Sequence, residues 1–130
     1  MTAPPRVVIA GSGSGVGKTA ITTGLMSRLS RGRKVQGYKV GPDFIDPMYH
    51  TAATGRSSRN LDSYFMEKGT LLNLFGWSSR EADLAVVEGV RGLYDGLTAT
   101  GDTGSTAEIA KFLQAPVILV RVGDERLAVH

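Results

Sequence analysis

Residues 11–19 read Gly-Ser-Gly-Ser-Gly-Val-Gly-Lys-Thr, and the rest of the chain is arranged around them. The apolar run at residues 7–10 precedes this stretch, and a helical pattern with Ile21, Leu25 and Leu29 on one stripe follows it. An apolar strand, a glycine loop, Gly-Lys-Thr and a helix form the architecture of a phosphate-binding P-loop. The sequence therefore predicts a site for a phosphorylated ligand between the first strand and the first helix.

The residue types in this loop explain its chemistry. Glycines allow several backbone N–H groups to point at one phosphate, and the following helix adds the positive end of its dipole. Lys18 supplies a mobile charge for the outer phosphates, and the Thr19 hydroxyl can bind a magnesium ion. A glycine-rich turn that binds nothing is the alternative, but strand, loop, Gly-Lys-Thr and helix all agree with a P-loop.

The spacing of the loop departs from the commonest P-loop pattern. Ser12 stands where the first glycine is usual, and Gly11 lies one residue earlier. This spacing resembles a P-loop subclass that includes dethiobiotin synthetase, the cobalamin-pathway amidotransferases and the MinD/ParA ATPases.

Bulk composition narrows the class of protein. The chain has 130 residues, a net charge of +3 and no cysteine, which fits one domain without disulfides or thiolate metal sites. No run approaches the roughly 18 apolar residues of a membrane span, and residues 1–6 lack the apolar segment of a signal peptide. We therefore expect a cytoplasmic protein with no membrane partner.

A group of basic residues lies where the first helix is expected to end. Their positive charge complements the negative end of that helix dipole. Because no aromatic residues are interleaved among them, we expect no nucleic-acid partner. The group consists of Arg28, Arg31, Arg33 and Lys34.

Short apolar runs alternate with helical patterns along the chain. The runs are nearly continuous rather than alternating, which is typical of buried parallel strands. They cover residues 7–10, 35–40, 84–87 and 116–120. Helices are predicted from the P-loop to near Gly32, at residues 47–54, at residues 67–80, and from Ser105, with Glu108 completing a capping box. The fold class is therefore α/β, a P-loop NTPase-like three-layer sandwich with a mostly parallel sheet.

The loop after the second predicted strand carries charged residues. Lys39 ends the strand, and Asp43 and Asp46 bracket a turn rich in proline. Carboxylates opposite a bound triphosphate are repulsive unless a cation lies between them, so both aspartates are candidate magnesium ligands. Lys39 could contact the transferred phosphate or an anionic substrate. Taken alone, an ordinary Asp-Pro turn with a surface lysine explains the same residues.

The third predicted strand ends in an acid, Glu88, within the stretch Val-Val-Glu-Gly-Val-Arg-Gly. Apolar residues that end in an acid match the second nucleotide motif of P-loop proteins, which brings a carboxylate beside Thr19 and magnesium. Asp95 ends the loop that follows, facing the same cleft. A strand end followed by a glycine turn is the alternative.

Residues 49–62 form a polar segment that is dense in donors. Arg56 and Arg59 could bind carboxylates with two hydrogen bonds each. An ordinary solvated loop explains the segment equally well, and His50 alone is typical of a hydrogen-bonding histidine rather than a catalytic base.

Taken together, these stretches closely resemble one family, the N-terminal synthetase domain of cobyrinate a,c-diamide synthases, which include the archaeal nickel-sirohydrochlorin a,c-diamide synthase. The resemblance runs from about residue 6 to residue 120 and depends on six motifs. They lie at residues 11–19, 39–47, 49–56, 58–62, 88–96 and 104–111.

The resemblance implies glutamine- and ATP-dependent amidation of the a and c acetate side chains of an anionic tetrapyrrole. ATP phosphates would bind Gly13, Ser14, Gly15, Val16, Gly17, Lys18 and Thr19. Magnesium would bind Thr19, Asp46 and Glu88. Lys18, Lys39, Asp43 and Asp95 would form the reaction centre. The substrate would contact His50, Arg56, Arg59, Asn60 and Asp62.

The chain also departs from this family. Family members carry a C-terminal glutaminase domain with a catalytic cysteine, and this sequence contains neither. The family pattern stops after Val120. Residues 1–130 are therefore expected to be the N-terminal part of a synthetase domain that is incomplete at its C-terminal end. A separate glutaminase domain or subunit would supply ammonia, and a homodimer is possible.

Two other functions stay open at this point. One is a MinD/ParA-like regulatory ATPase, although that class places a lysine early in the loop, where this chain has Gly13. The other is a non-catalytic fragment that only binds nucleotide.

Overall fold

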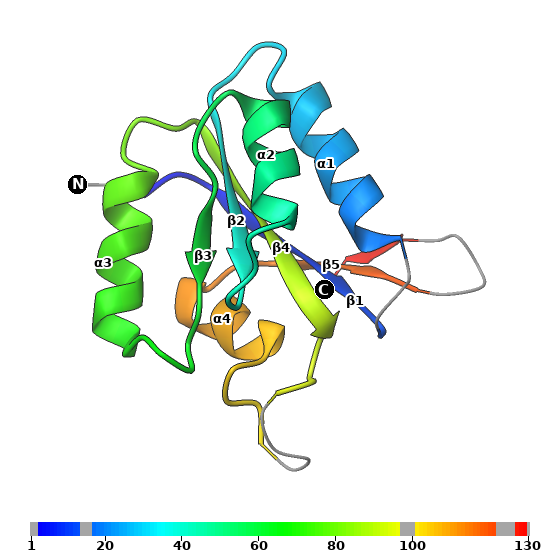
Figure 1. Cartoon of the computed structure of the whole chain (residues 1–130), viewed down its shortest axis with the longest axis vertical. Helices are drawn as coiled ribbons and strands as arrows, with labels where there is room; N and C mark the ends of the chain where they lie inside the picture. The colour runs from blue at the N-terminus through cyan, green and yellow to red at the C-terminus, as the bar shows by residue number, and fades with distance from the viewer. Residues whose placement is uncertain (1–2, 14–16, 97–100, 122–126, 130) are drawn as a thin grey trace.

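The apolar runs form the strands of a single sheet in the computed structural model, which describes residues 3–13, 17–96, 101–121 and 127–129 (Figure 1). The strands are β1 (Arg6–Gly11), β2 (Val35–Val40), β3 (Arg59–Leu61), β4 (Leu84–Gly92), β5 (Val117–Val120) and β6 (Leu127–Val129). Their order is β3-β2-β4-β1-β5-β6. Neighbouring strands from β3 to β5 are parallel and β6 is antiparallel to β5, which confirms a mostly parallel sheet.

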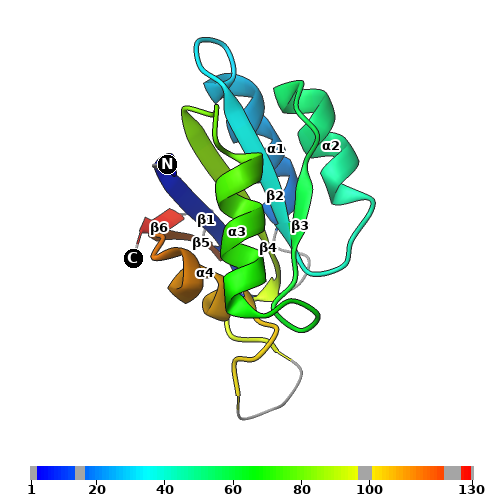
Figure 2. The same cartoon turned by 90° about the vertical axis from the view of Figure 1, so that its left-hand side faces the viewer.

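Helices cover both faces of this sheet and complete the three predicted layers. They are α1 (Lys18–Leu29), α2 (Asp46–Thr54), α3 (Lys68–Ser78) and α4 (Thr106–Leu113). Figure 1 shows α1 and α2 together on one side of the sheet, and Figure 2 shows α3 and α4 on the other.

Two hydrophobic clusters result, because successive side chains of a strand point to opposite faces. Val8 and Val87 pack in the cluster that α3 and α4 supply with Phe75 and Ile109. Their neighbours Ile9 and Val86 pack in the cluster that α1 supplies with Met26. A strand buried on both faces reads as a continuous apolar run, which is the pattern seen in the sequence.

Local signals predicted the helix ends with small errors. Ser105 caps α4 by accepting a hydrogen bond from the Glu108 backbone N–H at 3.1 Å, as the predicted capping box requires. The Glu108 carboxylate, however, accepts from Gly104 N at 3.1 Å. Helix α1 ends at Leu29, with Ser30 as its C-cap, shortly before the predicted Gly32.

Two short strands at the ends of the sheet, β3 and β6, were missed by the sequence patterns. Residues 59–61 were predicted as part of a polar loop, and they form β3, which pairs with β2 so that Tyr38 faces Arg59 and Val40 faces Leu61. A three-residue edge strand is too short to show an apolar run or a period-two pattern. Within the described ranges, no helix is long and apolar enough to cross a bilayer.

Candidate functional site

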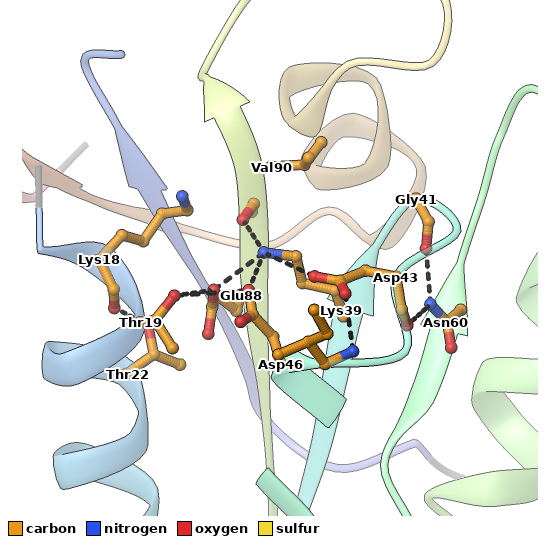
Figure 3. A network of polar contacts seen from close by, with 12 residues as sticks. Lys18, Thr19, Thr22, Lys39, Gly41, Asp43, Asp46, Asn60, Glu88 and Val90 are labelled. Carbon is orange, nitrogen blue, oxygen red and sulfur yellow. Dashed lines mark hydrogen bonds and ion pairs between the residues drawn. The ribbon is translucent and has the colours of Figure 1, made fainter. Parts of the chain in front are cut away.

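The charged residues predicted from separate loops meet at the carboxyl edge of the sheet. Lys39 on β2 and Glu88 on β4 are direct neighbours in the strand register, and Glu88 also faces Ile9 on β1. Thr19 reaches them from the first turn of α1, and Asp46 from the first turn of α2 (Figure 3). Parallel strands joined through helices place these elements at one edge, which explains the convergence.

Thr19 and the two predicted metal-binding acids are in contact. The Thr19 hydroxyl donates to Glu88 Oε2 at 2.9 Å and lies 3.4 Å from Asp46 Oδ2. Three oxygen-bearing side chains therefore surround one point at the start of α1. Among the residues that the structure describes, no group of three or more His, Cys, Asp or Glu side chains is arranged to hold a metal ion.

Lys39 lies at the centre of this cluster. Its ammonium donates to Asp46 Oδ2 at 2.6 Å, to Glu88 Oε2 at 2.9 Å and to the Gly89 carbonyl at 3.1 Å, and Asp43 Oδ2 lies 3.8 Å away. Only 3% of Lys39 is exposed, and Glu88 is fully buried. Lys39 thus bonds the same two carboxylate oxygens that the Thr19 hydroxyl approaches.

The two oxygens of the Glu88 carboxylate have different partners. Oε2 faces Thr19 and Lys39, whereas Oε1 lies 2.8 Å from Nε2 of His50, which is fully buried. Nδ1 of His50 lies 3.1 Å from the Ser58 hydroxyl. A neutral imidazole that donates from Nε2 and accepts from Ser58 satisfies both contacts. The structure therefore places His50 behind Glu88 and away from solvent.

Close packing of opposite charges shifts the pKa values of the cluster. Partial burial opposes ionisation of Asp46, but hydrogen bonds with Glu88 and Lys39 and the charge of Lys39 outweigh it and lower the pKa of Asp46 to about 2. Burial disfavours the Lys39 ammonium, yet Asp46 and Glu88 outweigh that effect and raise the pKa of Lys39. Both groups are therefore ionised at neutral pH.

Lys18 begins α1 beside this cluster. Burial and the positive charge of Lys39 lower the pKa of Lys18, against the opposite effect of Glu88 and Asp46. Gly17 precedes it with a φ of 82°, a left-handed conformation that favours glycine, and no side chain caps the first turn. The first N–H groups of α1 are thus not occupied by a side-chain cap, as an anion-binding helix end requires. Of the predicted phosphate-binding residues, Ser14, Gly15 and Val16 lie outside the described residues.

The remaining acids and Asn60 hold the surrounding loops. Asn60 donates to the carbonyls of Gly41 and Asp43, both at 2.7 Å, and so ties the loop after β2 to β3. Asp43 also accepts from Ile45 N at 2.8 Å. Asp62 accepts from the Tyr64 N–H at 3.0 Å.

Asp95 closes the turn that follows β4. It accepts from the Gly92 N–H at 3.0 Å. A Cβ on Gly92 would lie 2.8 Å from Asp95 Oδ2 and 3.1 Å from the Ser12 carbonyl, so this turn packs closely against the P-loop. Asp95 is therefore beside the loop that is predicted to bind phosphate.

The two predicted substrate-binding arginines are not part of this cluster. Arg56 donates to Gln36 Oε1 at 3.0 Å and to the Ser78 carbonyl at 3.4 Å. The Arg59 guanidinium lies 5.4 Å from the centre of the Trp77 ring. Gln36 is near the start of β2 and Trp77 is near the end of α3, so both arginines contact elements toward the opposite edge of the sheet.

The chain is similar to a known domain family and to named proteins. A family model described as the CobQ/CobB/MinD/ParA nucleotide binding domain matches residues 7–127. A Methanocaldococcus jannaschii protein named cobyrinate a,c-diamide synthase is 60% identical over 115 residues. Proteins of the same name from Methanobrevibacter smithii and Archaeoglobus fulgidus are each 56% identical, over 115 and 117 residues. These matches cover 88%, 88% and 89% of this chain but only 26% of each relative, so the chain spans about a quarter of their length.

Proposed function

Because the chain belongs to the CobQ/CobB/MinD/ParA nucleotide-binding domain family, we propose that it is the ATP-binding part of a ligase that amidates the a and c acetate carboxylates of a tetrapyrrole of the cobyrinate or nickel-sirohydrochlorin type. The observation that supports this best is the meeting of Lys18, Thr19, Lys39, Asp46 and Glu88 at one sheet edge, directly beside the P-loop. The names of the similar proteins supply the substrate class.

The roles of these residues follow from their positions. Lys18 and the open first turn of α1 would bind the ATP phosphates and stabilise the negative charge of the transferred phosphoryl group. Lys39, at the end of β2, would neutralise the substrate carboxylate or the same phosphoryl group. Asp43 and Asp95 are kept in the proposal as neighbours of the reaction centre, since one lies beside Lys39 and the other beside the P-loop.

Magnesium fits the oxygen atoms of this site. Mg²⁺ is usually held by one or two carboxylates together with phosphate and water oxygens. Thr19, Asp46 and Glu88 offer one hydroxyl and two carboxylates around one point, and they would hold the ion. When bound, the ion supplies positive charge that neutralises the β- and γ-phosphate oxygens.

The proposed reaction has two steps. First, a substrate carboxylate oxygen attacks the γ-phosphorus of ATP and the bond to the β-phosphate oxygen breaks, which gives an acyl phosphate and ADP. Ammonia then attacks the acyl carbon, phosphate leaves and a proton is lost, which gives the amide. Neither step needs a nucleophile from the protein, in agreement with a sequence that has no cysteine. We propose that glutamine supplies the ammonia through a glutaminase outside this chain, and that the reaction is cytoplasmic.

The positions of the five predicted substrate-binding residues decide which of them stay in the proposed substrate site. Asn60 and Asp62 lie at the carboxyl end of β3 or directly after it, and they stay in the proposal. His50 is buried behind Glu88, and Arg56 and Arg59 contact elements toward the opposite edge. These three residues are therefore left out of the proposed substrate site.

The test supplies the purified chain with ATP, magnesium and ammonium, together with cobyrinate or nickel-sirohydrochlorin, and measures ADP release. Release that depends on the tetrapyrrole supports the ligase, and Asp102→Asn, which changes a partly exposed carboxylate outside the cluster, should not alter it. Release stimulated by DNA or lipid instead would favour a MinD/ParA-like ATPase. Nucleotide binding without turnover would favour a non-catalytic domain and contradict catalysis by this chain.

A further inference from the structure

A second polar cavity lies away from the candidate nucleotide site. It has a volume of about 250 Å³ and is lined mainly by Gln36, Arg56, Arg59, Trp77 and Arg80. Gln36 precedes Lys39 by three residues on β2, which corresponds to about 10 Å along the strand. The lining residues come from the start of β2, the segment before β3 and the end of α3. Figure 2 shows the end of α3 near the amino ends of the strands. One small ligand cannot occupy this cavity and the P-loop together.

A buried amide anchors the first guanidinium of this cavity. Gln36 is 3% exposed and donates to the Ser57 carbonyl at 2.8 Å and to the Gly37 carbonyl at 3.1 Å. These bonds orient its Oε1, which accepts from Arg56 Nε at 3.0 Å. The Arg56 side chain is thus held by a fixed partner below the surface, which lowers the entropy cost of binding a ligand.

The other two guanidiniums pack against Trp77. Arg80 lies 4.6 Å and Arg59 5.4 Å from the centre of its ring, and Arg80 also donates to the Trp77 carbonyl at 2.7 Å. Trp77 is 53% exposed. Cation–π contacts leave the N–H groups at the edge of a guanidinium available for hydrogen bonds.

Three positive charges therefore share one small cavity. In the part of the chain that the structure describes, none of the three arginines forms an ion pair with a carboxylate. The side-chain hydrogen bonds of Arg56 and Arg80 go to uncharged oxygens. Like charges this close repel one another, and an anion between them removes that repulsion. Guanidiniums match carboxylate and phosphate oxygens with paired hydrogen bonds.

From this geometry we propose that the cavity is a binding site for a carboxylate or phosphate anion, separate from the nucleotide site. Its volume is below the roughly 300 Å³ at which pockets for larger organic ligands begin, so the occupant is a small free anion or one acidic group of a peptide. Gln36 and Arg56 form the floor of the site, and Arg59 and Arg80 close around the anion beside Trp77.

Trp77 gives a direct test, because it is the only tryptophan in the chain. The full chain is titrated at constant ionic strength with inorganic phosphate, citrate or a poly-glutamate peptide, and Trp77 fluorescence is recorded. We expect the Trp77 fluorescence to change and to reach saturation as the anion concentration rises. The double variant Arg59→Gln/Arg80→Gln should weaken binding by about tenfold or more, because charge-assisted hydrogen bonds are lost. Arg91→Gln, which removes an exposed arginine near the carboxyl end of β4, should bind as the wild type does.

The possible outcomes distinguish a free anion from an acidic peptide, and binding in the cavity from binding at the P-loop. Saturation by phosphate or citrate supports a free small anion, and saturation by the peptide alone supports an acidic segment. Lys18→Ala should bind equally well, since the P-loop is not involved. The proposal is overturned if no probe gives saturation, or if the double variant, shown to be folded by circular dichroism, binds as tightly as Arg91→Gln. Neither result bears on ATP use, which is measured separately.

Discussion

Replacing Lys39 with methionine tests the charged cluster most directly. Methionine keeps much of the length and apolar character of the side chain but removes the ammonium. Asp46 and Glu88 would then lose donors at 2.6 and 2.9 Å, and the carboxylate of Glu88 would stay fully buried. We expect the folded protein to be destabilised, because a buried charge would have lost its opposite charge.

The expected size of the effect follows from burial. Breaking a buried ion pair costs about 3–5 kcal/mol. The Asp46 side chain is 18% exposed and can be rehydrated in part, and Glu88 keeps His50 and Thr19 as partners. We therefore expect a loss of unfolding free energy at the lower end of this range, about 3 kcal/mol. With a urea m value of about 2 kcal/mol/M, the unfolding midpoint should fall by about 1.5 M.

Urea unfolding followed by circular dichroism measures this change. Lys111→Met is a matched control, because Lys111 pairs with Asp102 at 2.7 Å but its side chain is 69% exposed. That variant should keep a midpoint close to the wild type. Magnesium chloride should raise the midpoint of Lys39→Met more than that of the wild type, since the carboxylates would then lack a neutralising cation. Equal midpoints for the two methionine variants would refute the argument.

Three further predictions concern the same region. Glu88→Gln in a complete enzyme should abolish ATP turnover, measured as ADP release, while the circular dichroism spectrum stays unchanged; full activity would contradict its proposed role. The pKa of Asp46 is lowered from 3.8 to about 2 in the folded protein, which stabilises the fold by at most about 2 kcal/mol. This stabilisation is complete above the unfolded pKa and is lost as pH falls from about 4 through 2. The free energy of unfolding of Asp46→Asn should therefore fall less than that of the wild type between pH 4 and 2. An equal fall in the two proteins would contradict the proposed pKa of Asp46. Gly89→Ala should cost about 1–3 kcal/mol in thermal or urea unfolding, because the new Cβ would lie 2.7 Å from Thr106 Cγ2 and 3.0 Å from the Ile9 carbonyl; a neutral effect would show that this contact can relax.

Several parts of the site could be predicted because they depend on local sequence. Lys18 and Thr19 follow a glycine loop at the start of a helix, so their position relative to that helix is fixed by chain geometry. Asp46 follows the parallel strand β2, and Glu88 was predicted to end the strand that the structure extends to Gly92. The rule that the carboxyl ends of parallel strands share one edge predicts that the two acids lie close together. The structure places both acids against Thr19, as this rule requires.

Other parts could not be predicted, because they depend on which strands are neighbours. Lys39 was expected to face phosphate or substrate, and its bonds to Asp46 and Glu88 follow from the pairing of β2 with β4. Arg56 and Arg59 were grouped with the substrate loop. The register of β3 with β2 sets Arg59 beside Tyr38, and the contacts of the two guanidiniums with Gln36 and Trp77 carry them toward the amino edge. No periodic pattern in a three-residue strand reveals that register.

The sequence by itself determined the four longer strands, the helices between them, the three layers and the place of the glycine loop between β1 and α1, because apolar runs, glycines and helix caps act over a few residues. Only the tertiary structure decided that His50 lies behind Glu88. Helix α2 packs against β2 at Gly37, where a Cβ would come within 3.1 Å of His50 Cβ. That close approach brings an imidazole from one segment against a carboxylate 38 positions away. Such a contact depends on how whole elements pack, and no short stretch of residues encodes it.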